Sequence, residues 1–303
     1  MAPPPTYRIG VDGGGTKTDL ILVDPAGNIL ARHTGPGCNP SHLGGVAARN
    51  VLQQALAALL GQATVSQIEG AISHTLLCLA GSPDFWREAA AELKTHGAVS
   101  TTTDAAPVLE LATGGGTGMA VHAGTGSFVA ARAPDGHVHY AGGLGWKLGD
   151  AGSAFDVARR AVAHGVLELQ GWLPATALRD ALVEHTGLGD PRAITRFFHQ
   201  DPDANPRLAA FAVRVSDLAD HGCQPAQAAL AASLTELVDL ARAVTEKLYG
   251  DARVPCGISG ALLNSPAAVF ALKALAESHG WRAELHFLRA PPIEGVRQLL
   301  MKL

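Results

Sequence analysis

Short segments with the apolar pattern of β-strands follow one another closely at the start of the chain. The pattern indicates strands over residues 7–12, 18–23 and 28–33, with Pro25 and Gly27 in a turn before the last of them. Apolar periodicity then indicates, in order, a helix over 41–60, a strand over 71–79, a helix over 84–94 and a strand that ends at Thr103 and Asp104. Strands that alternate with helices are typical of the α/β class.

A second set of strands resembles the first. It follows a glycine cluster at 113–118, and its strands are predicted over 119–123, 127–132 and 137–140. Placing residues 9–30 beside 119–140 matches strand with strand, glycine loop with glycine loop and turn with turn. Such a repeat predicts duplicated lobes. We place the N-terminal lobe over 1–115 and the C-terminal lobe over 116–303, the latter mostly helical from 148 to 249 with later strands over 254–259 and 284–288.

Composition narrows the class of protein. The 303 residues are 47% apolar and 17% charged, which indicates a compact globular chain, and the 35 glycines exceed the usual share of about 7%. The net charge is −4 and the basic residues are scattered, so the sequence shows no cluster of positive charge that would bind nucleic acid or an anionic membrane. No apolar run approaches the roughly 18 residues of a membrane span. Residues 1–7 lack the features of a signal peptide, and the four cysteines form no close pair, so we expect a cytoplasmic protein.

The first glycine loop has the composition of a phosphate cradle. Its residues are Asp12, Gly13, Gly14, Gly15, Thr16, Lys17 and Thr18. Successive backbone N–H groups and a cation can converge there on anionic oxygens. A strand follows the loop where a Walker A or Rossmann loop requires a helix, so the phosphate would lie at a hairpin tip. A plain glycine-rich turn explains one such loop equally well. The repeat favours phosphate binding, because the equivalent tip holds Gly124, Thr125, Gly126 and Ser127.

Four motifs in one order carry a resemblance to a known family. They cover residues 10–18, 124–127, 142–153 and 258–264. The chain resembles the kinase-like ATPases of the actin, Hsp70 and hexokinase fold, within the branch of N-acetylglucosamine kinases, glucosamine kinases and BadF/BadG/BcrA/BcrD-type ATPases. The resemblance implies an α/β, two-lobed, ribonuclease H-like fold with duplicated lobes, mixed sheets and an interlobe cleft. It also implies ATP and Mg²⁺ as cofactors and a sugar as substrate.

The resemblance assigns Asp12 to Mg²⁺ and the two glycine loops to the phosphates of ATP. Asp12 has an alternative as a strand-end aspartate that caps its own turn. The adenosine would contact Ser259, Gly260, Ala261 and Asn264, although a strand-to-helix turn explains that segment almost as well.

Asp104 would be the general base that accepts the proton of the sugar hydroxyl. It ends a β-rich run and opens a helix, which puts its carboxylate at the carboxyl end of a strand, where open α/β sheets bind ligands. Asp is also a favoured helix N-cap, and one residue could serve in both ways.

Sugar contacts are expected from Asn39, Gly143, Gly145 and Asp150. Asn39 could instead be a turn residue, and Asp150 could cap a helix. One departure stands out, because Ala151 occupies a position where relatives carry glutamate. This removes a carboxylate from the edge of the pocket and leaves the acceptor sugar open.

Several alternatives accompany this hypothesis. His137 and His139 could bind a metal, but on a hairpin strand they are better explained as solvent-facing, and Trp146 could stack on a sugar or pack within the 142–153 segment. The acceptor could be N-acetylglucosamine, giving the 6-phosphate, or glucosamine. The chain could also be an activator ATPase of acyl-CoA dehydratases or reductases, or a non-catalytic sugar sensor. A homodimer is compatible with the resemblance.

Overall fold

The computed structural model describes residues 6–62, 65, 70–200 and 204–303, so the first five residues, on which part of the localisation argument depends, lie outside the described residues. The chain forms two compact units. One comprises residues 1–115 together with 290–303, and the other comprises residues 116–289. Among the described residues, no helix combines the length and apolar character needed to cross a membrane.

The first unit is built on a mixed five-stranded sheet. Its strands are β1 (Thr6–Gly13), β2 (Lys17–Val23), β3 (Ile29–Pro36), β4 (Ala71–Leu79) and β5 (Ala98–Thr103). They lie in the order β3-β2-β1-β4-β5, with β1, β2 and β3 antiparallel and with β4 and β5 parallel to β1. These strands agree with the predicted ones to within a few residues.

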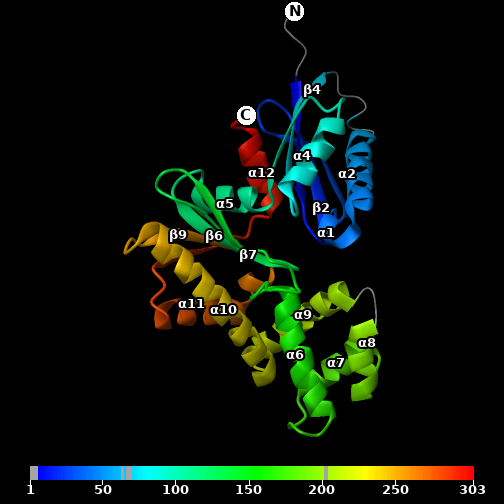
Figure 1. Ribbon diagram of the computed structural model, residues 1–303, viewed down its shortest axis with the longest axis vertical. Coiled ribbons are helices and arrows are strands. Elements are labelled where there is room, and N and C mark those ends of the chain that lie inside the picture. The colour runs from blue at the N-terminus through cyan, green and yellow to red at the C-terminus, as the bar shows by residue number, and fades with distance from the viewer. Residues whose placement is uncertain (1–5, 63–64, 66–69, 201–203) are drawn as a thin grey trace, which may run out of the picture. The chain divides into compact units, whose positions relative to one another are not determined.

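Side-chain alternation gives this sheet two apolar faces. Ile9 and Val11 of β1 pack in one core with α2 (Gly45–Leu60) and α4 (Pro83–Glu92), which contributes the buried Trp86 (Figure 1). Ile21 and Val23 of β2 point to the opposite face. The single helix predicted over 41–60 is wrong at its start. Gly44, with φ of 78°, ends the short α1 (Pro40–Leu43) before α2 begins.

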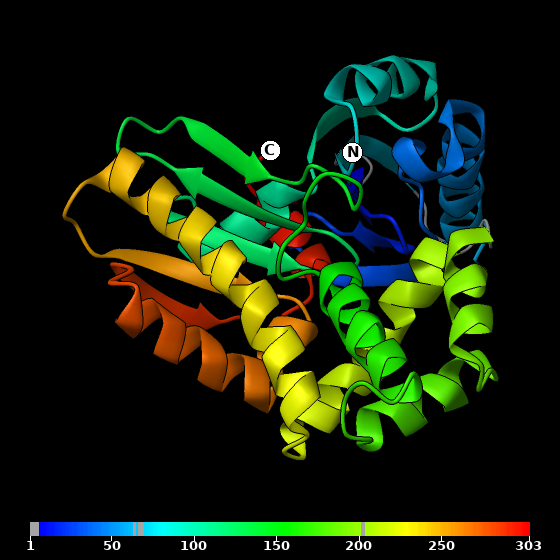
Figure 2. The ribbon, with the colours of Figure 1, turned by 60° about the horizontal axis from the view of Figure 1, so that its bottom comes forward.

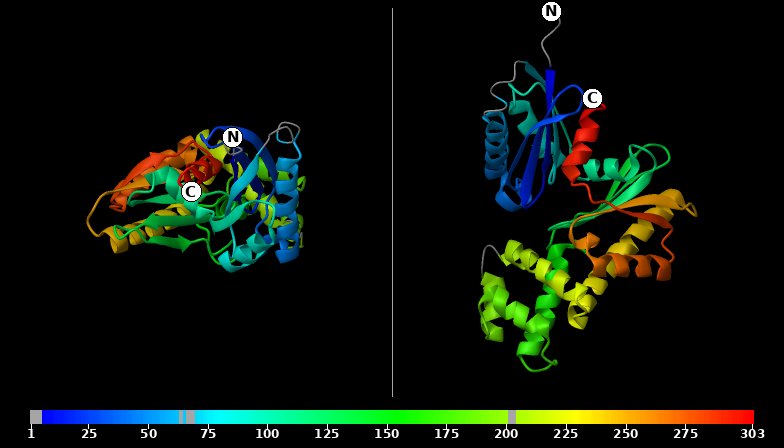
Figure 3. Two further views of the ribbon diagram at one scale, coloured as in Figure 1. Left: turned by 90° about the horizontal axis from the view of Figure 1, so that it is seen from above. Right: turned by 180° about the vertical axis from the view of Figure 1, so that it is seen from behind.

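The C-terminal helix belongs to the first unit, which corrects the assignment of residues 290–303 to the C-terminal lobe. α12 (Pro292–Leu300) packs on β1 and on α5 (Ala105–Thr113), as the view from behind in Figure 3 also shows. The approach is close because Gly10 has no side chain; a Cβ there would lie 2.7 Å from Val296. Arg8 donates a hydrogen bond to the carbonyl of Leu300, which fixes the end of the helix.

The second unit repeats the sheet of the first. Its strands are β6 (Gly118–Ala123), β7 (Ser127–Arg132), β8 (Val138–Gly142), β9 (Val254–Ser259) and β10 (Ala283–Phe287). Read from β8, their order β8-β7-β6-β9-β10 is that of β3-β2-β1-β4-β5, with the same antiparallel and parallel pairs. The predicted duplication and the mixed sheets are therefore confirmed.

Helices supply most of the core of the second unit. They are α6 (Ala154–Leu169), α7 (Ala177–Thr186), α8 (Pro191–Gln200), α9 (Ala204–Asp220), α10 (Gln224–Tyr249) and α11 (Pro266–Ser278), with a short 3₁₀ turn, η1 (Leu262–Asn264). α10 runs along the sheet in Figure 2. Its Tyr249 hydroxyl donates to the carbonyls of Gly118 and Arg132, which ties the helix to β6 and β7.

The contact between α12 and α5 gives a stability prediction. A Cβ on Gly295 would lie 2.1 Å from the carbonyl oxygen of Pro107, so Gly295→Ala must push the two helices apart. We expect a loss of about 1 to 3 kcal/mol, the usual cost of overpacking, seen as a lower melting temperature by circular dichroism. Gly189→Ala is the matched control because its Cβ would meet nothing within 4 Å. Equal melting temperatures for the two variants would contradict this packing.

Candidate functional site

The tip of the first hairpin is braced from both sides. Gly14 donates its N–H to the carbonyl of Lys17 at 3.0 Å, and its own carbonyl accepts from Cys38 at 3.1 Å. Gly13 cannot be replaced without displacement, because a Cβ would lie 2.4 Å from Leu79 and 2.6 Å from the Cys38 sulfur. Because these glycines have no side chain, the backbone of the hairpin tip packs directly against Cys38 and Leu79.

Polar side chains fix the start of β2. The Lys17 ammonium lies 2.6 Å from Asp19 Oδ2, and the Thr34 hydroxyl donates to Asp19 Oδ1 at 2.6 Å. Thr18 is buried and donates to the carbonyl of Pro36 at 2.8 Å. Lys17, which was expected to supply the positive charge of the glycine loop, therefore forms an ion pair with Asp19. Sequence reasoning missed Asp19, although its hairpin register opposite Asp12 was available from the turn.

Asp12 is a half-buried carboxyl group with other acids nearby. In the sheet it pairs with Asp19 on one side and with Cys78 on the other. Burial is the main cause that raises the pKa of Asp12 from 3.8 to about 7, followed by the negative charges of Asp104 and Asp19. Lys17 acts in the opposite direction but does not cancel the shift. The Asp12 carboxyl group therefore binds a proton more readily than an ordinary aspartate does.

Asp104 directly follows β5 and begins α5. Burial raises the pKa of its carboxyl group to about 6, and the backbone N–H groups of Asp104 and Ala105 offset part of the shift. The alternative of an ordinary N-cap is not what the structure shows. Asp104 has helical φ and ψ of −60° and −15°, and its side chain makes no capping hydrogen bond. The missing capping hydrogen bond has a local cause. The third residue of the helix is Pro107, which has no N–H group to donate to the Asp104 side chain.

The residues around Asp12 fit a magnesium ion only in part. Among the described residues, no group of three or more His, Cys, Asp or Glu side chains could hold a metal by itself. Mg²⁺ is commonly bound through one or two carboxylates with waters and substrate phosphates, so a protein cage is not required. The half-buried Asp12 carboxyl group, with neighbouring acids and beside a glycine-rich tip, has the chemistry of such a partial site.

Asn39, expected to bind the sugar, serves locally as a helix cap. Its Oδ1 accepts the N–H of Ser41 at 2.9 Å at the start of α1. A Cβ on Gly81, which follows β4, would lie 3.2 Å from the same oxygen. Asn39 is therefore a helix N-cap and not the turn residue of the alternative, and its contact with a sugar stays a prediction.

The second glycine tip is held by the segment over 142–153. The N–H of Gly124 donates to the carbonyl of Gly126 at 2.8 Å, and the Ser127 hydroxyl donates to the carbonyl of Ala151 at 2.7 Å. A Cβ on Gly126 would lie 2.8 Å from the Asp150 carboxylate. Gly124–Ser127 and Asp150 are thus brought together.

Asp150 is not a helix cap. It has φ of 68° and accepts the N–H of Gly145 at 3.2 Å, while Ser153 caps α6. Gly143 and Gly145 also have positive φ, and the Tyr140 hydroxyl lies 2.4 Å from where a Cβ of Gly143 would be. The expected sugar contacts of this unit therefore lie on one strained loop beside the glycine tip.

The expected adenosine segment follows β9. The Gly260 backbone, with φ of 113°, packs on β6 so closely that a Cβ would lie 1.9 Å from the carbonyl oxygen of Ala123. Ala261 precedes η1, and Asn264 Nδ2 donates to the carbonyl of Gly260 at 2.9 Å, which closes the turn. Ser259 is buried at the end of β9.

Exposure decides the alternative for the two histidines, while the stacking of Trp146 on a sugar stays a prediction. His137 and His139 are exposed on or beside β8, and His137 lies 3.2 Å from Asp135, so the solvent-facing interpretation is confirmed. The Trp146 ring is tilted against Phe155 with centroids 5.4 Å apart and is 39% exposed.

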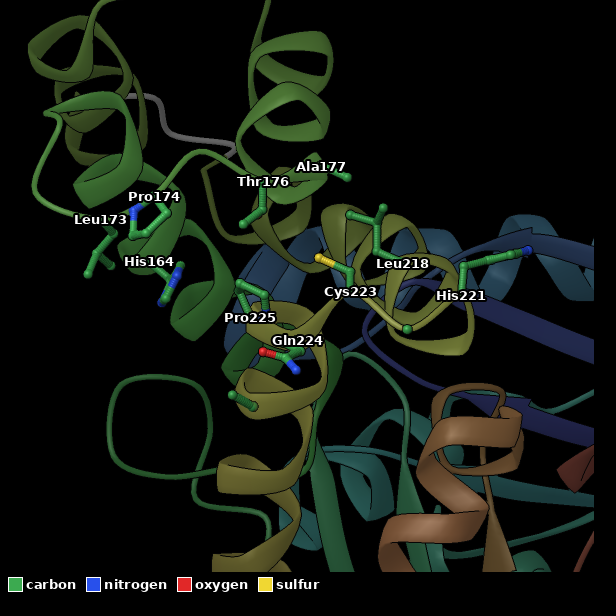
Figure 4. A pocket seen from close by; sticks show the side chains of 12 residues that line it. His164, Leu173, Pro174, Thr176, Ala177, Leu218, His221, Cys223, Gln224 and Pro225 are labelled. Carbon is green, nitrogen blue, oxygen red and sulfur yellow. The ribbon is translucent and has the colours of Figure 1, made fainter.

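A pocket of about 730 Å³ lies elsewhere in the second unit (Figure 4). Its lining includes His164 of α6, Thr176 at the N-cap of α7, and His221 and Cys223 in the turn between α9 and α10. None of the predicted site residues lines it.

Two units with one strand order, each with a glycine-rich hairpin tip beside polar groups, define the duplicated ATPase fold of actin and hexokinase. The chain belongs to the BadF/BadG/BcrA/BcrD ATPase family, whose model matches residues 9–297. A curated relative, the N-acetyl-D-glucosamine kinase of Dictyostelium discoideum, is 26% identical over 257 residues, which is 79% of each chain.

Solved structures agree with this fold. A protein of Chromobacterium violaceum, provisionally named an N-acetylglucosamine kinase, is 26% identical with a TM-score of 0.75, and the match covers 97% of this chain and 98% of that one. A Porphyromonas gingivalis protein with the same provisional name is 20% identical, covers 97% and 98%, and has a TM-score of 0.76. A glucokinase of the ROK family from Streptomyces griseus is 15% identical, covers 96% and 97%, and has a TM-score of 0.59. The last two matches show the fold alone.

The raised pKa of Asp12 predicts a pH dependence of stability. The folded chain binds this proton more tightly than the unfolded chain, so the stability it contributes is complete below pH 3.8 and is lost as the pH rises through about 7. Asp12→Asn removes that loss. Between pH 5 and pH 8 we expect the wild type to lose on the order of 2 kcal/mol relative to Asp12→Asn, measured by urea unfolding. Asp251→Asn, at an exposed side chain, is the control and should follow the wild type.

Parallel stability curves for the wild type and Asp12→Asn from pH 5 to pH 8 would mean that the Asp12 carboxyl group is not perturbed by its surroundings.

Proposed function

We propose that this protein is a sugar kinase that transfers the γ-phosphoryl group of ATP to a hydroxyl of an amino sugar. N-Acetylglucosamine is the proposed acceptor and its 6-phosphate the product. Membership of an ATPase family supports the use of ATP, and two relatives at 26% identity bear the name of N-acetylglucosamine kinase. The single observation that carries the proposal is the half-buried Asp104 carboxylate, which makes no helix-capping hydrogen bond and whose charge acts on Asp12.

Asp104 is the proposed general base. Phosphoryl transfer needs a group that orients the attacking hydroxyl and accepts its proton. A base is most effective when its pKa lies near the working pH, because it is then ionised and still binds a proton well. Burial brings the pKa of Asp104 to about 6, which is close to a neutral working pH. A carboxylate already used as a cap would be less available for this task.

Asp12 is the proposed ligand of Mg²⁺, directly or through water. The ion, when bound with ATP, supplies positive charge to the phosphates. It would also stabilise the ionised form of Asp12, whose pKa is otherwise raised to about 7. Gly13–Thr18 and Gly124–Ser127 are the proposed phosphate contacts, Ser259–Asn264 the adenosine contacts, and Asn39, Gly143, Gly145 and Asp150 the sugar contacts. A cytoplasmic location and a homodimer stay predictions.

Two alternatives differ in their chemistry. Glucosamine differs from N-acetylglucosamine only at the C2 nitrogen, and Ala151 adds no charged group that selects between them. An activator ATPase would hold an iron–sulfur cluster through accessible cysteines at a dimer interface. Cys38, Cys78 and Cys256 are buried in this chain, which disfavours the activator.

Sugar-dependent ADP release tests the proposed function. Purified protein is assayed with Mg-ATP and N-acetylglucosamine, glucosamine, glucose or N-acetylmannosamine, with a control that lacks sugar. We expect turnover that depends on the sugar and is fastest with N-acetylglucosamine. Hydrolysis that does not depend on sugar would favour an activator ATPase. Sugar binding without turnover would favour a sensor.

Replacing the proposed base should remove turnover and leave binding intact. We expect Asp104→Asn to lower kcat by about 10²- to 10⁴-fold, the usual contribution of a general base. Affinities for ATP and sugar, measured by calorimetry, should change little because the amide has the same shape. Asp84→Asn is a matched control, since Asp84 also lies at the start of a helix after a strand but is 79% exposed. Undiminished kcat in Asp104→Asn would remove this residue from the reaction.

Replacing the proposed metal ligand should change the response to Mg²⁺. For Asp12→Asn we expect the Mg²⁺ concentration at half-maximal turnover to rise about 10- to 100-fold. The measurement is a Mg²⁺ titration at saturating ATP and sugar. Asp84→Asn should retain the wild-type Mg²⁺ response. An identical Mg²⁺ curve for Asp12→Asn and the wild type would exclude Asp12 as a ligand.

A further inference from the structure

A row of paired residues crosses the second sheet at the end of its strands. His122 of β6 lies opposite Ser259 of β9 and opposite Phe128 of β7. Phe128 in turn lies opposite Gly142 of β8. Each member of the row lies at the edge of a loop with a proposed ligand contact, so a side chain at the centre of the row can influence several loops together.

The imidazole of His122 occupies that central place. Its Nδ1 lies 3.1 Å from the Ser259 hydroxyl, and its ring stacks on Phe128 with centroids 5.1 Å apart and planes at 29°. The Nε2 atom points to the glycine tip, because a Cβ on Gly124 would lie 3.5 Å from it. His122 therefore contacts the end of β9 and the start of the β6–β7 tip with the same ring.

The surroundings of His122 fix its chemical form. Burial lowers the pKa of the imidazole to about 4, so the ring is neutral near pH 7. A neutral imidazole has one N–H donor and one acceptor, and a hydroxyl can complement either. Ser259 is only 2% exposed, so water has little access to compete for this hydrogen bond. The stack on Phe128 holds the plane of the ring.

We propose that His122 is a positioning residue for ATP. Through its hydrogen bond to Ser259 and its stacked ring, His122 holds the Ser259 turn and the Gly124 tip in one arrangement. This role rests on the proposed function only in that the second unit binds the nucleotide. His122 itself takes no part in the transfer step. Its loss should weaken nucleotide binding and leave the rate of the bound complex almost unchanged.

Two substitutions of His122 separate the hydrogen bond from packing. His122→Phe keeps a flat ring but loses the bond to Ser259, and His122→Asn keeps a polar atom close to the position of Nδ1. We expect His122→Phe to weaken ATP binding about 3- to 10-fold, the effect of one hydrogen bond, in calorimetry without sugar. The KM for ATP should rise by the same factor while kcat stays within about twofold. His122→Asn should recover most of the affinity.

Controls keep this proposal distinct from a loss of folding. His139→Phe, at an exposed histidine of the same sheet, should bind ATP like the wild type. Combining His122→Phe with Ser259→Ala should weaken binding no more than Ser259→Ala alone, because Ser259→Ala already removes the hydrogen bond to His122 together with any contact of the hydroxyl with adenosine. If His122→Phe fails to fold in a thermal melt, His122→Leu, which also lacks both ring nitrogens, carries the same test.

Unchanged ATP affinity in His122→Phe, or losses that add in the double variant, would overturn the proposal. A fall in kcat without a change in ATP affinity would overturn it too. Because ATP binding is measured without sugar, a wild-type chain that binds ATP but phosphorylates none of the sugars contradicts the proposed function alone.

Discussion

The desolvation of two half-buried acidic side chains, Asp12 and Asp104, is the constraint on which the chemistry of the first unit depends. A carboxylate is costly to bury without a partner, so the fold must hold these groups in place by other means. The parallel strands β1, β4 and β5 end at one edge of the sheet. Burial, and then the negative charges of Asp12 and Asp104, raise the pKa of the Cys78 thiol on β4. The apolar cores on the two faces of the sheet supply the stability that keeps this edge intact.

The duplicated sheets give the same position two different chemistries. Asp12 is paired with the second and fourth strands of its sheet, and His122 is paired with the corresponding strands β7 and β9. Burial raises the pKa of Asp12, which therefore binds a proton more readily, and lowers the pKa of His122, which therefore stays neutral. One topology thus places an acidic, cation-seeking group in one unit and an uncharged, hydrogen-bonding group in the other. Such a division fits the proposed function, in which Asp12 is a ligand of Mg²⁺ and the second unit holds the adenosine.

The amino-acid pattern predicted the strands and both glycine tips because strand periodicity and turn residues act locally. Residues 290–303 were assigned to the wrong lobe, since the fit of α12 on β1 depends on the absence of a side chain at Gly10, far away in the chain. Asp19 and His122 were missed for a similar reason. Each gains its importance from partners on neighbouring strands, and a strand pattern alone does not say which charged or aromatic side chains meet. The roles of Asp12 and Asp104 came from the family resemblance and stay proposals.

The most direct test of this account is the titration of the two acids by NMR of ¹³C-labelled aspartate carboxyl groups, with signals assigned through Asp12→Asn and Asp104→Asn. The account predicts that Asp12 titrates near pH 7 and Asp104 near pH 6 in the protein without nucleotide. It also predicts that the Asp12 signal stays in its ionised form at pH 6 once Mg-ATP is added. If both acids titrate near pH 4, like exposed aspartates, the carboxyl groups are not held as described and the proposed chemistry has no basis in their burial.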